Sequence, residues 1–242
     1  MSVAVPDSER TASQYDAMAV EYANDNDDNS WNAYYERPAT IELLGDVAGL
    51  DVLEVGCGSG PLTEWLVAQG ARVTAFDVSP RMLQLAKERV GDSAQFLVAD
   101  VTQPLTFAAD QSIDIVVASL VLHYIEHWEP VLTELRRALR PDGTLVFSTH
   151  HPAMDWRIHS PDDYFAKKQI TETWDKGPGH YEVTFWRRPL TEMTAAIGSA
   201  GFVIDKLIEP KPVPELGATN SRHFRLLSTR PQFLFFRLRV LA

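Results

Sequence analysis

Hydrophobic positions change their period along the chain, and the change separates an N-terminal helical part from an alternating strand–helix part. In the first 48 residues, apolar side chains recur every three or four positions, as they do on one face of a helix. This spacing predicts helices over residues 13–22 and 36–48, with the polar stretch 25–29 between them. Residues before about Arg10 carry no such pattern, and we expect a frayed terminus there.

Between residues 51 and 150, short apolar runs alternate with helical patterns. The runs predict strands at 51–55, 72–76, 95–99, 113–120 and 144–149, separated by helices at 62–69, 80–90 and 131–140. Alternation of strand and helix is typical of a parallel sheet covered on both faces. The almost wholly apolar run at 113–120 fits a strand that is buried on both sides.

The alternation stops over residues 151–189, which are rich in tryptophan and histidine and contain one predicted strand, 181–186. It resumes with a helix at 190–200, a strand starting at 201–204 and a last strand at 233–240. We therefore predict a helical cap (1–35), an α/β core (36–150), an insertion or lid on the substrate side (151–189) and a C-terminal part of the same α/β domain (190–242).

Composition narrows the possible partners. The 242 residues are 45% hydrophobic and carry a formal net charge of −11, which argues against a nucleic-acid partner because phosphates need a basic surface. The single cysteine, Cys57, allows no internal disulfide, no cysteine-rich metal site and no iron–sulfur cluster. No signal peptide and no run of about 18 apolar residues is present. We expect a cytoplasmic protein with a small-molecule substrate, no membrane partner and no metal, as a monomer or homodimer.

A glycine loop follows the first predicted strand. Its sequence, Gly56-Cys57-Gly58-Ser59-Gly60, leads into a helix, and glycines there let the backbone approach a ligand closely and turn with positive φ. A dinucleotide fingerprint places its third glycine one residue later, where this chain has Pro61. The loop therefore departs from the dinucleotide fingerprint, and taken alone it fits either a ligand-binding loop or a simple strand–helix turn.

Two aspartates end the next predicted strands. Asp77 closes the second strand and Asp100 the third, so both lie at carboxyl ends beside the same crevice. A carboxylate at the first position can accept hydrogen bonds from ribose hydroxyls, and one at the second can accept one from an adenine amino group. Either aspartate alone could be a helix-start or turn residue, but the two positions together favour a nucleoside site.

Five segments resemble successive motifs of one enzyme family, the class I S-adenosylmethionine (SAM)-dependent methyltransferases. These segments are residues 52–60, 76–79, 99–101, 119–123 and 139–143, and they are most similar to the small-molecule group that includes quinone-ring methylases. The resemblance implies a Rossmann-like, doubly wound α/β fold with helices on both faces of a seven-stranded, mainly parallel sheet. Its last strand would be antiparallel, and residues 233–240 fit that strand. The implied cofactor is SAM and the product is S-adenosylhomocysteine (SAH).

The resemblance also implies the cofactor contacts. Glu54 and the glycine loop would hold the methionine part, Asp77 the ribose, and Asp100 the adenine, while a tyrosine-rich N-terminal helix would cover the site. The residues assigned to SAM in this way are Tyr22, Glu54, Gly56, Cys57, Gly58, Gly60, Asp77, Val78, Met82, Asp100, Val101, Ser119 and His123.

The acceptor side is less defined. His150 and His151 end the fifth strand and His123 follows the fourth, so each is a candidate general base or positioning group. Because side chains alternate along a strand, only one of His150 and His151 should face the substrate; both could equally be polar strand-end residues. Candidate substrate contacts are Tyr15, Trp31, Tyr35, Trp156 and Trp186, although the aromatic residues near the N-terminus could instead belong to the core.

Two other patterns point to different functions. Tyr164 and Lys168 have the spacing of a short-chain dehydrogenase pair but lie after the fifth predicted strand, not the fourth. The C-terminal arginines, from Arg222 to Arg239, could steer an anionic substrate or form a solvated face. A SAM-binding sensor or scaffold without catalysis remains the alternative. The favoured hypothesis is methyl transfer to a small, ring-containing or partly apolar acceptor.

Overall fold

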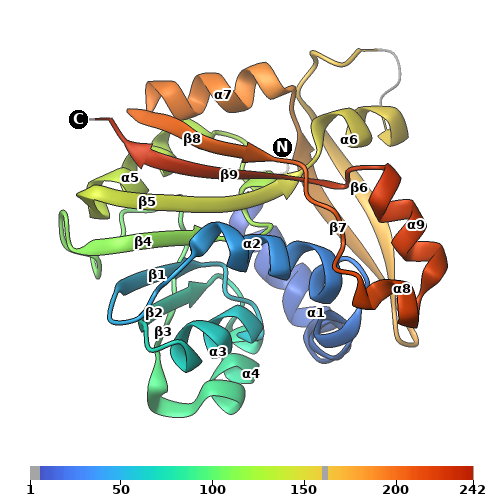
Figure 1. Ribbon diagram of the computed structural model, residues 1–242, viewed down its shortest axis with the longest axis horizontal. Coiled ribbons are helices and arrows are strands. Elements are labelled where there is room, and N and C mark those ends of the chain that lie inside the picture. Colours follow the sequence, from blue (N-terminus) through green and yellow to red (C-terminus); the bar gives the residue numbers. More distant parts are fainter. Residues whose placement is uncertain (1–5, 160–162, 242) are drawn as a thin grey trace, which may run out of the picture.

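The computed structural model describes residues 6–159 and 163–241 and is built around a seven-stranded sheet (Figure 1). The strand order is β3-β2-β1-β4-β5-β9-β8, and only β9 runs antiparallel to its neighbours. The strands are β1 (Asp51–Val55), β2 (Arg72–Asp77), β3 (Gln95–Val98), β4 (Ile113–Ala118), β5 (Leu139–His150), β8 (Phe202–Ile208) and β9 (Phe233–Val240). The doubly wound α/β fold that the sequence predicts is confirmed, including the antiparallel strand at 233–240.

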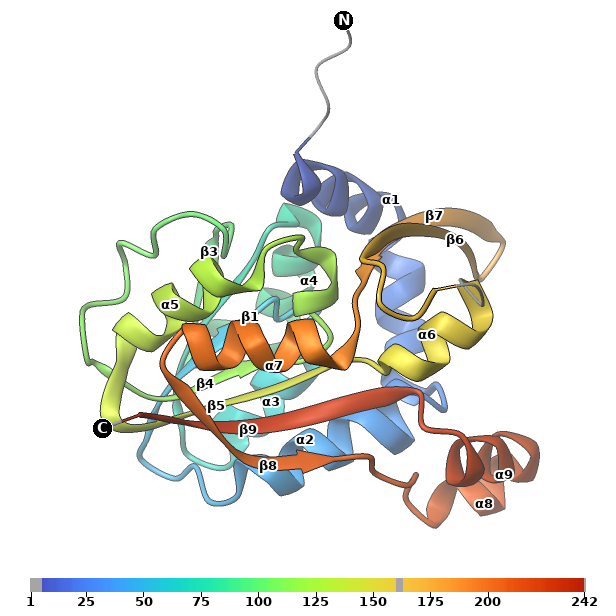
Figure 2. The same cartoon turned by 90° about the horizontal axis from the view of Figure 1, so that it is seen from above.

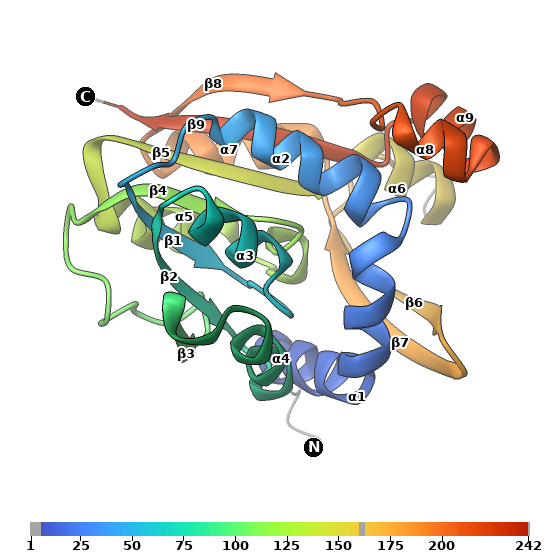
Figure 3. The ribbon, with the colours of Figure 1, turned by 60° about the horizontal axis from the view of Figure 1, so that its bottom comes forward.

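Helices cover both faces of this sheet. The helices are α1 (Asp7–Asp28), α2 (Arg37–Leu44), α3 (Pro61–Ala68), α4 (Pro80–Val90), α5 (Trp128–Ala138), α6 (Pro152–His159), α7 (Leu190–Ser199), α8 (Glu215–Thr219) and α9 (Ser221–Thr229). The apolar sides of α5 and α7 form one buried cluster with the sheet, and those of α2 and α3 form a second cluster on its opposite face (Figures 2 and 3). The sheet is therefore apolar on both sides, as the pattern at 113–120 indicates.

A two-stranded hairpin lies outside the main sheet. It consists of β6 (Lys168–Lys176) and β7 (Gly179–Arg187), which pair in antiparallel fashion. The sequence predicts only one strand here, at 181–186, because β6 has few apolar residues and all of its side chains are half-buried or exposed. The hairpin packs beside α1, so segments about 150 residues apart in the chain lie together (Figure 3).

The N-terminal helices differ from their predicted bounds. The first helix already begins at Asp7, where the sequence indicates a frayed terminus, because Trp186 and Arg10 both bond to the Asp7 carboxylate and fix that end. The second predicted helix starts instead with a π-helical turn, η1 (Asn32–Glu36), and continues as α2 to Leu44. Gly45 stops it with φ of +72°. The π-helical turn directs Glu36 toward the interior of the protein.

The C-terminal region contains two short helices, α8 and α9, between β8 and β9. Arg222 and Arg225 lie on α9, and Asn220 caps that helix by accepting the His223 N–H at 3.0 Å. In the described part of the chain, no helix combines the length and the apolar character needed to cross a bilayer.

Candidate active site

A cavity of about 440 Å³ lies at the carboxyl ends of the central strands, which is the usual ligand position in open α/β sheets. The loops after β1, β2, β3 and β4 form its floor and sides, while α1 and η1 close it from above. Of the residues that the sequence assigns to the cofactor, those lining this cavity are Tyr22, Glu54, Gly56, Cys57, Gly58, Asp77, Val78, Asp100, Val101 and Ser119.

The glycine loop is fixed to the end of β2. The backbone N–H groups of Gly56 and Cys57 both donate to the Phe76 carbonyl, at 2.8 and 3.1 Å. Gly58 has φ of +55°, and a Cβ added there would meet nothing within 4 Å. That open space belongs to the cavity, so Gly58 leaves the room that a ligand against the loop requires.

Asp77 joins the loop to the nucleoside side of the cavity. Its Oδ2 accepts the Gly58 N–H at 2.9 Å, and its Oδ1 accepts the Ser79 N–H at 2.9 Å. Burial raises the pKa of this carboxyl, although the backbone hydrogen bonds counteract the rise. Asp100 lies further along the cavity and accepts hydrogen bonds from the Thr102 N–H and hydroxyl, at 2.8 and 2.7 Å. Both aspartates thus occupy the strand ends that the sequence predicts.

Two more carboxyl groups, those of Glu54 and Glu36, line the cavity. Glu54, at 3% exposure, accepts a hydrogen bond from the Thr63 hydroxyl at 2.6 Å, and burial raises its pKa to about 8. Glu36, at 5% exposure, accepts hydrogen bonds from Thr40 and Ser148. Sequence patterns give no signal for Glu36, because it reaches the cavity only through the π-helical turn.

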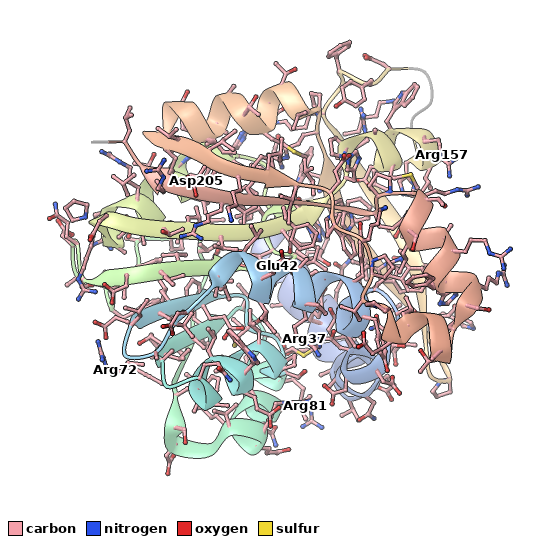
Figure 4. The ribbon with its side chains drawn as sticks, viewed as in Figure 1. Arg37, Glu42, Arg72, Arg81, Arg157 and Asp205 are labelled. Atoms are coloured by element: carbon pink, nitrogen blue, oxygen red, sulfur yellow. The ribbon has the colours of Figure 1, made fainter. Side chains whose placement is uncertain are left out.

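The charges of the cavity fit a cation better than a pyrophosphate. Among the described residues, Arg37 is the one arginine that lines it, whereas six residues with carboxyl groups do so: Asp7, Glu36, Glu54, Asp77, Asp100 and Glu126. Arg37 is the first residue of α2 and is labelled in Figure 4. Its guanidinium donates to the Asn26 carbonyl at 2.9 Å and has no ion-pair partner within 4.0 Å in the described part of the chain. SAM, which has a positive sulfonium and a carboxylate, matches both features.

A second sign of a missing ligand is the Ser119 hydroxyl. It lines the cavity and is buried, yet it has no hydrogen-bond partner among the described residues. Buried polar atoms are nearly always paired in a folded protein. Ser119 is therefore available to a bound molecule, and the residues present fit the cofactor that the sequence motifs imply.

Three tyrosines close the cavity toward α1. The hydroxyls of Tyr15 and Tyr124 lie 2.7 Å apart, and Tyr15 meets Tyr22 edge to face, with centroids 5.1 Å apart. Burial raises the pKa of Tyr15 and of Tyr22, so both stay neutral. Sequence reasoning misses Tyr124 because this residue follows β4 inside an apolar segment. The tyrosines and α1 cover the cavity against water.

Three residues assigned to the cofactor do not line the cavity. Gly60 starts α3, and a Cβ there would come within 3.0 Å of Ala86, so this glycine serves close packing between α3 and α4. Met82 is fully buried in α4, and its N–H donates to Ser79, the helix cap. His123 is buried behind Tyr124, which lines the cavity in its place.

The candidate bases lie outside the cavity as well. The His150 ring stacks on His123, with centroids 4.0 Å apart, and has Phe233 beyond it at 6.0 Å. His151 lies 2.6 Å from a Glu209 oxygen through Nε2, which points it away from the cavity. As sequence alternation indicates, the two histidines diverge. Neither lines the cavity, because the His150 ring is enclosed by His123 and by Phe185 of β7.

Of the candidate substrate contacts, only Tyr15 lines the cavity. Tyr35 is a core residue that packs on Phe233, and Trp31 packs on His223. Trp156 packs on Tyr164, and Trp186 donates to Asp7 at 2.7 Å from behind the cavity wall.

The insertion at 151–189, which the sequence predicts to be a lid on the substrate side, has a different position. No residue that the structure describes between 151 and 189 lines the cavity; instead the hairpin holds α1 in place. Trp174 stacks on Tyr22, with centroids 6.4 Å apart, and Lys176 lies over both rings at 5.6 and 5.7 Å. The hairpin supports the cover and does not itself form the pocket.

Comparisons with known proteins agree with this site. Residues 53–147 match the methyltransferase domain family. An uncharacterized protein of Haemophilus influenzae is 27% identical over 87% of this chain and 89% of its own length. A malonyl-[acyl-carrier protein] O-methyltransferase of Halalkalibacterium halodurans is 29% identical over 74% of this chain and 70% of its own. The solved structure of an S-adenosylmethionine-dependent methyltransferase from Mesorhizobium loti superposes with a TM-score of 0.66 at 26% identity, covering 84% of this chain and 96% of that one.

Identity is higher over shorter matches. Curated methyltransferases that are 32–37% identical to this chain are covered over 38–49% of their own length. The chain therefore spans less than half the length of these relatives, and the acceptors in their names are not carried over to it.

Proposed function

Because the chain belongs to the class I SAM-dependent methyltransferases, we propose that it methylates a small-molecule acceptor, which enters the cavity beside Tyr22, Asn32 and Glu36. The observation that carries this proposal is the cover formed by α1. This helix lines one side of the cavity and the hairpin packs on it, which supports an acceptor small enough to fit beneath the helix. A volume of about 440 Å³ lies within the range of small-molecule sites.

The chain's own residues divide the work of binding the cofactor. Asp77 would hold the ribose, Asp100 the edge of the adenine, and the Gly58 backbone the methionine part. We add Arg37 as the partner of the cofactor carboxylate, because its guanidinium lines the cavity without an ion-pair partner among the described residues. When bound, SAM supplies a methyl group on a positively charged sulfur, so the protein must mainly orient the two reactants and exclude water.

The acceptor side carries both polar and aromatic groups. Asn26, Asn32 and Glu36 provide hydrogen-bonding groups, and Tyr22 and Tyr124 provide aromatic surface. This mixture suits a partly apolar or ring-containing acceptor with one reactive polar atom. The named relatives are divided: one is named for a carrier-bound malonyl group and another for demethylmenaquinone. We therefore propose the class of acceptor and not one compound.

The test uses SAM labelled in its methyl group. The protein is incubated with labelled SAM and either a dialysed macromolecular fraction or the small-molecule fraction of a cell extract, and products are identified by mass spectrometry. We expect label in the small-molecule fraction, with SAH formed in equal amount, and loss of both with Asp77→Ala. Label confined to protein or nucleic acid would contradict a small-molecule acceptor.

A further inference from the structure

Glu36 occupies an unusual position for a charged side chain. It ends the π-helical turn η1, is 5% exposed, and lines the cavity between the methionine region and the acceptor side. Burial of an uncompensated carboxylate is costly, so such a group is retained either with a partner or with a function. Its surroundings distinguish these two possibilities.

Only one oxygen of Glu36 is engaged. Oε1 accepts the Thr40 hydroxyl at 2.7 Å and the Ser148 hydroxyl at 2.6 Å. Ser148 in turn accepts the Leu120 N–H at 2.9 Å, which fixes the network to the end of β4. Oε2 accepts no hydrogen bond from the residues that the structure describes, although the Ser119 hydroxyl lies near enough to the carboxyl group to lower its pKa. The carboxyl group is therefore held by one oxygen and has the other free for the cavity.

The charged groups around Glu36 do not neutralise it. Arg37 follows it in the chain and lowers its pKa, but lies beyond ion-pair distance. Glu54 and Asp77 line the same cavity from β1 and β2, and Tyr22 faces it from α1 with a neutral hydroxyl. Burial is the largest influence and raises the pKa of Glu36, whereas the neighbouring hydroxyls lower it. A positive charge or a proton in the cavity would complete this site.

We propose that Glu36 is a catalytic residue: its carboxylate balances the charge of bound SAM and takes the proton that the acceptor releases. In the transfer, the acceptor atom forms a bond to the methyl carbon while the sulfur–methyl bond breaks and leaves its electron pair on sulfur. The acceptor's proton moves to Glu36 Oε2. The positive charge thus passes from sulfur to a proton on the carboxyl group, and the cavity keeps the same net charge before and after the reaction.

This role of Glu36 rests on the proposed function. Glu36 takes the place of the histidines as the candidate base. His150 and His151 lie outside the cavity, whereas Glu36 Oε2 is accessible from it. Glu54 is the competing carboxyl, since it is equally buried and bonded through one oxygen only. It lies below the glycine loop, while Glu36 is bonded to Ser148 on β5 and through it to the loop after β4, where acceptor and cofactor would meet.

The proposal has a test that needs no acceptor. SAM and SAH differ by the methyl group and its positive charge, so a carboxyl group that pairs with the sulfonium should be protonated when SAH replaces SAM. Titration calorimetry of each ligand near neutral pH, in buffers of different ionisation enthalpy, counts the protons bound. For the native protein we expect SAH binding to take up about one proton more than SAM binding.

Three variants locate that proton. Glu36→Gln should abolish the difference and reduce the preference for SAM over SAH by about tenfold. Glu54→Gln should keep the difference, and so should Glu42→Gln, an exposed carboxyl on α2 that serves as the matched control. If Glu36→Gln does not fold, Ser148→Ala takes its place: losing one donor to Oε1 should move the proton uptake to higher pH.

The outcomes separate the two proposals. Equal proton uptake for both ligands in the native protein, or a difference that survives in Glu36→Gln or disappears equally in Glu54→Gln, would overturn the role of Glu36. Failure of labelled methyl to reach any small molecule would instead overturn the proposed function, and the calorimetric result would still decide how Glu36 responds to the cofactor charge.

Discussion

The rings of His123 and His150 stack at 4.0 Å between centroids, with 16° between their planes. Burial, followed by the neighbouring His150, lowers the pKa of His123 well below its usual value. The folded protein therefore keeps this ring neutral, while the unfolded chain protonates it at mildly acidic pH. The stack links the strand end of β5 to the segment after β4, and we interpret it as a packing feature of the site's wall.

His123→Phe should remove a pH dependence. A base whose pKa is lowered on folding binds fewer protons in the native state, so its contribution to stability is lost as pH falls below about 6.5. The phenylalanine keeps the stack and carries no buried nitrogen without a partner. We expect the free energy of unfolding, measured by urea denaturation, to fall less steeply between pH 6.5 and 5 than in the native protein. His127→Gln, at an exposed position, is the control and should leave the slope unchanged.

Glu54→Gln should change how the free energy of unfolding depends on pH at higher pH values. Folding raises the pKa of Glu54 from the ordinary 4.5 to about 8, so the native state binds more protons and stability is lost as pH rises from about 5 to 8. The slope for one such group approaches about 1.4 kcal/mol per pH unit. The glutamine still accepts the Thr63 hydroxyl and should flatten the fall in urea unfolding experiments. An unchanged slope would mean that Glu54 is ionised in the folded protein at neutral pH.

Alanine at two glycines should separate binding from stability. Gly58→Ala meets open space, so it should cost only the backbone strain of about 1 kcal/mol while its methyl group enters the cavity and weakens SAM binding by about tenfold. Gly60→Ala places a Cβ 3.0 Å from Ala86 and should lower the free energy of unfolding by about 1–3 kcal/mol. Calorimetric affinity and urea midpoints measure the two effects. If both variants lose SAM affinity in the same proportion to their loss of stability, the assignment of Gly58 to binding and of Gly60 to packing is wrong.

Trp174→Ala should loosen the cover. The indole stacks on Tyr22 and lies under Lys176, so its loss removes the main aromatic contact between hairpin and cavity wall. We expect SAM to dissociate about tenfold faster in stopped-flow displacement, with a small change in the urea midpoint because Trp174 is only partly buried. Glu182→Ala, at an exposed position on the same hairpin, should dissociate SAM at the native rate.

The sheet and the nucleoside side of the cavity could be predicted because their signals are local. A strand, a glycine turn and an acidic residue at the next strand end follow one another within about 25 residues, and the parallel topology brings them together. Asp77 and Asp100 therefore line the cavity as expected. The bounds of β9 were also predicted correctly, because its residues are mostly apolar, and its antiparallel direction is the one that the family resemblance implies.

The acceptor side could not be predicted in the same way. Glu36 and Arg37 line the cavity because η1 and the start of α2 lie beside the strand ends, and Tyr124 does so from a short helical turn after β4. No periodic pattern indicates either placement. The histidines at the end of β5 have a strand position that suits catalysis, yet His150 packs on His123 and Phe185, His151 contacts Glu209, and neither lines the cavity. Strand position predicts which edge of the sheet a side chain reaches and not what else covers that edge.

The cover over the cavity has a consequence for synthesis of the chain. Helix α1 is made first, but Trp174 and Trp186, which hold it in place, emerge about 150 residues later. Strand β9, which lies between β5 and β8 in the sheet, is made after both of them. A nascent chain that ends after β5 thus has the glycine loop and both aspartates but no closed cavity. We infer that the ribosome-bound chain acquires tight cofactor binding late, after most of its parallel sheet has formed.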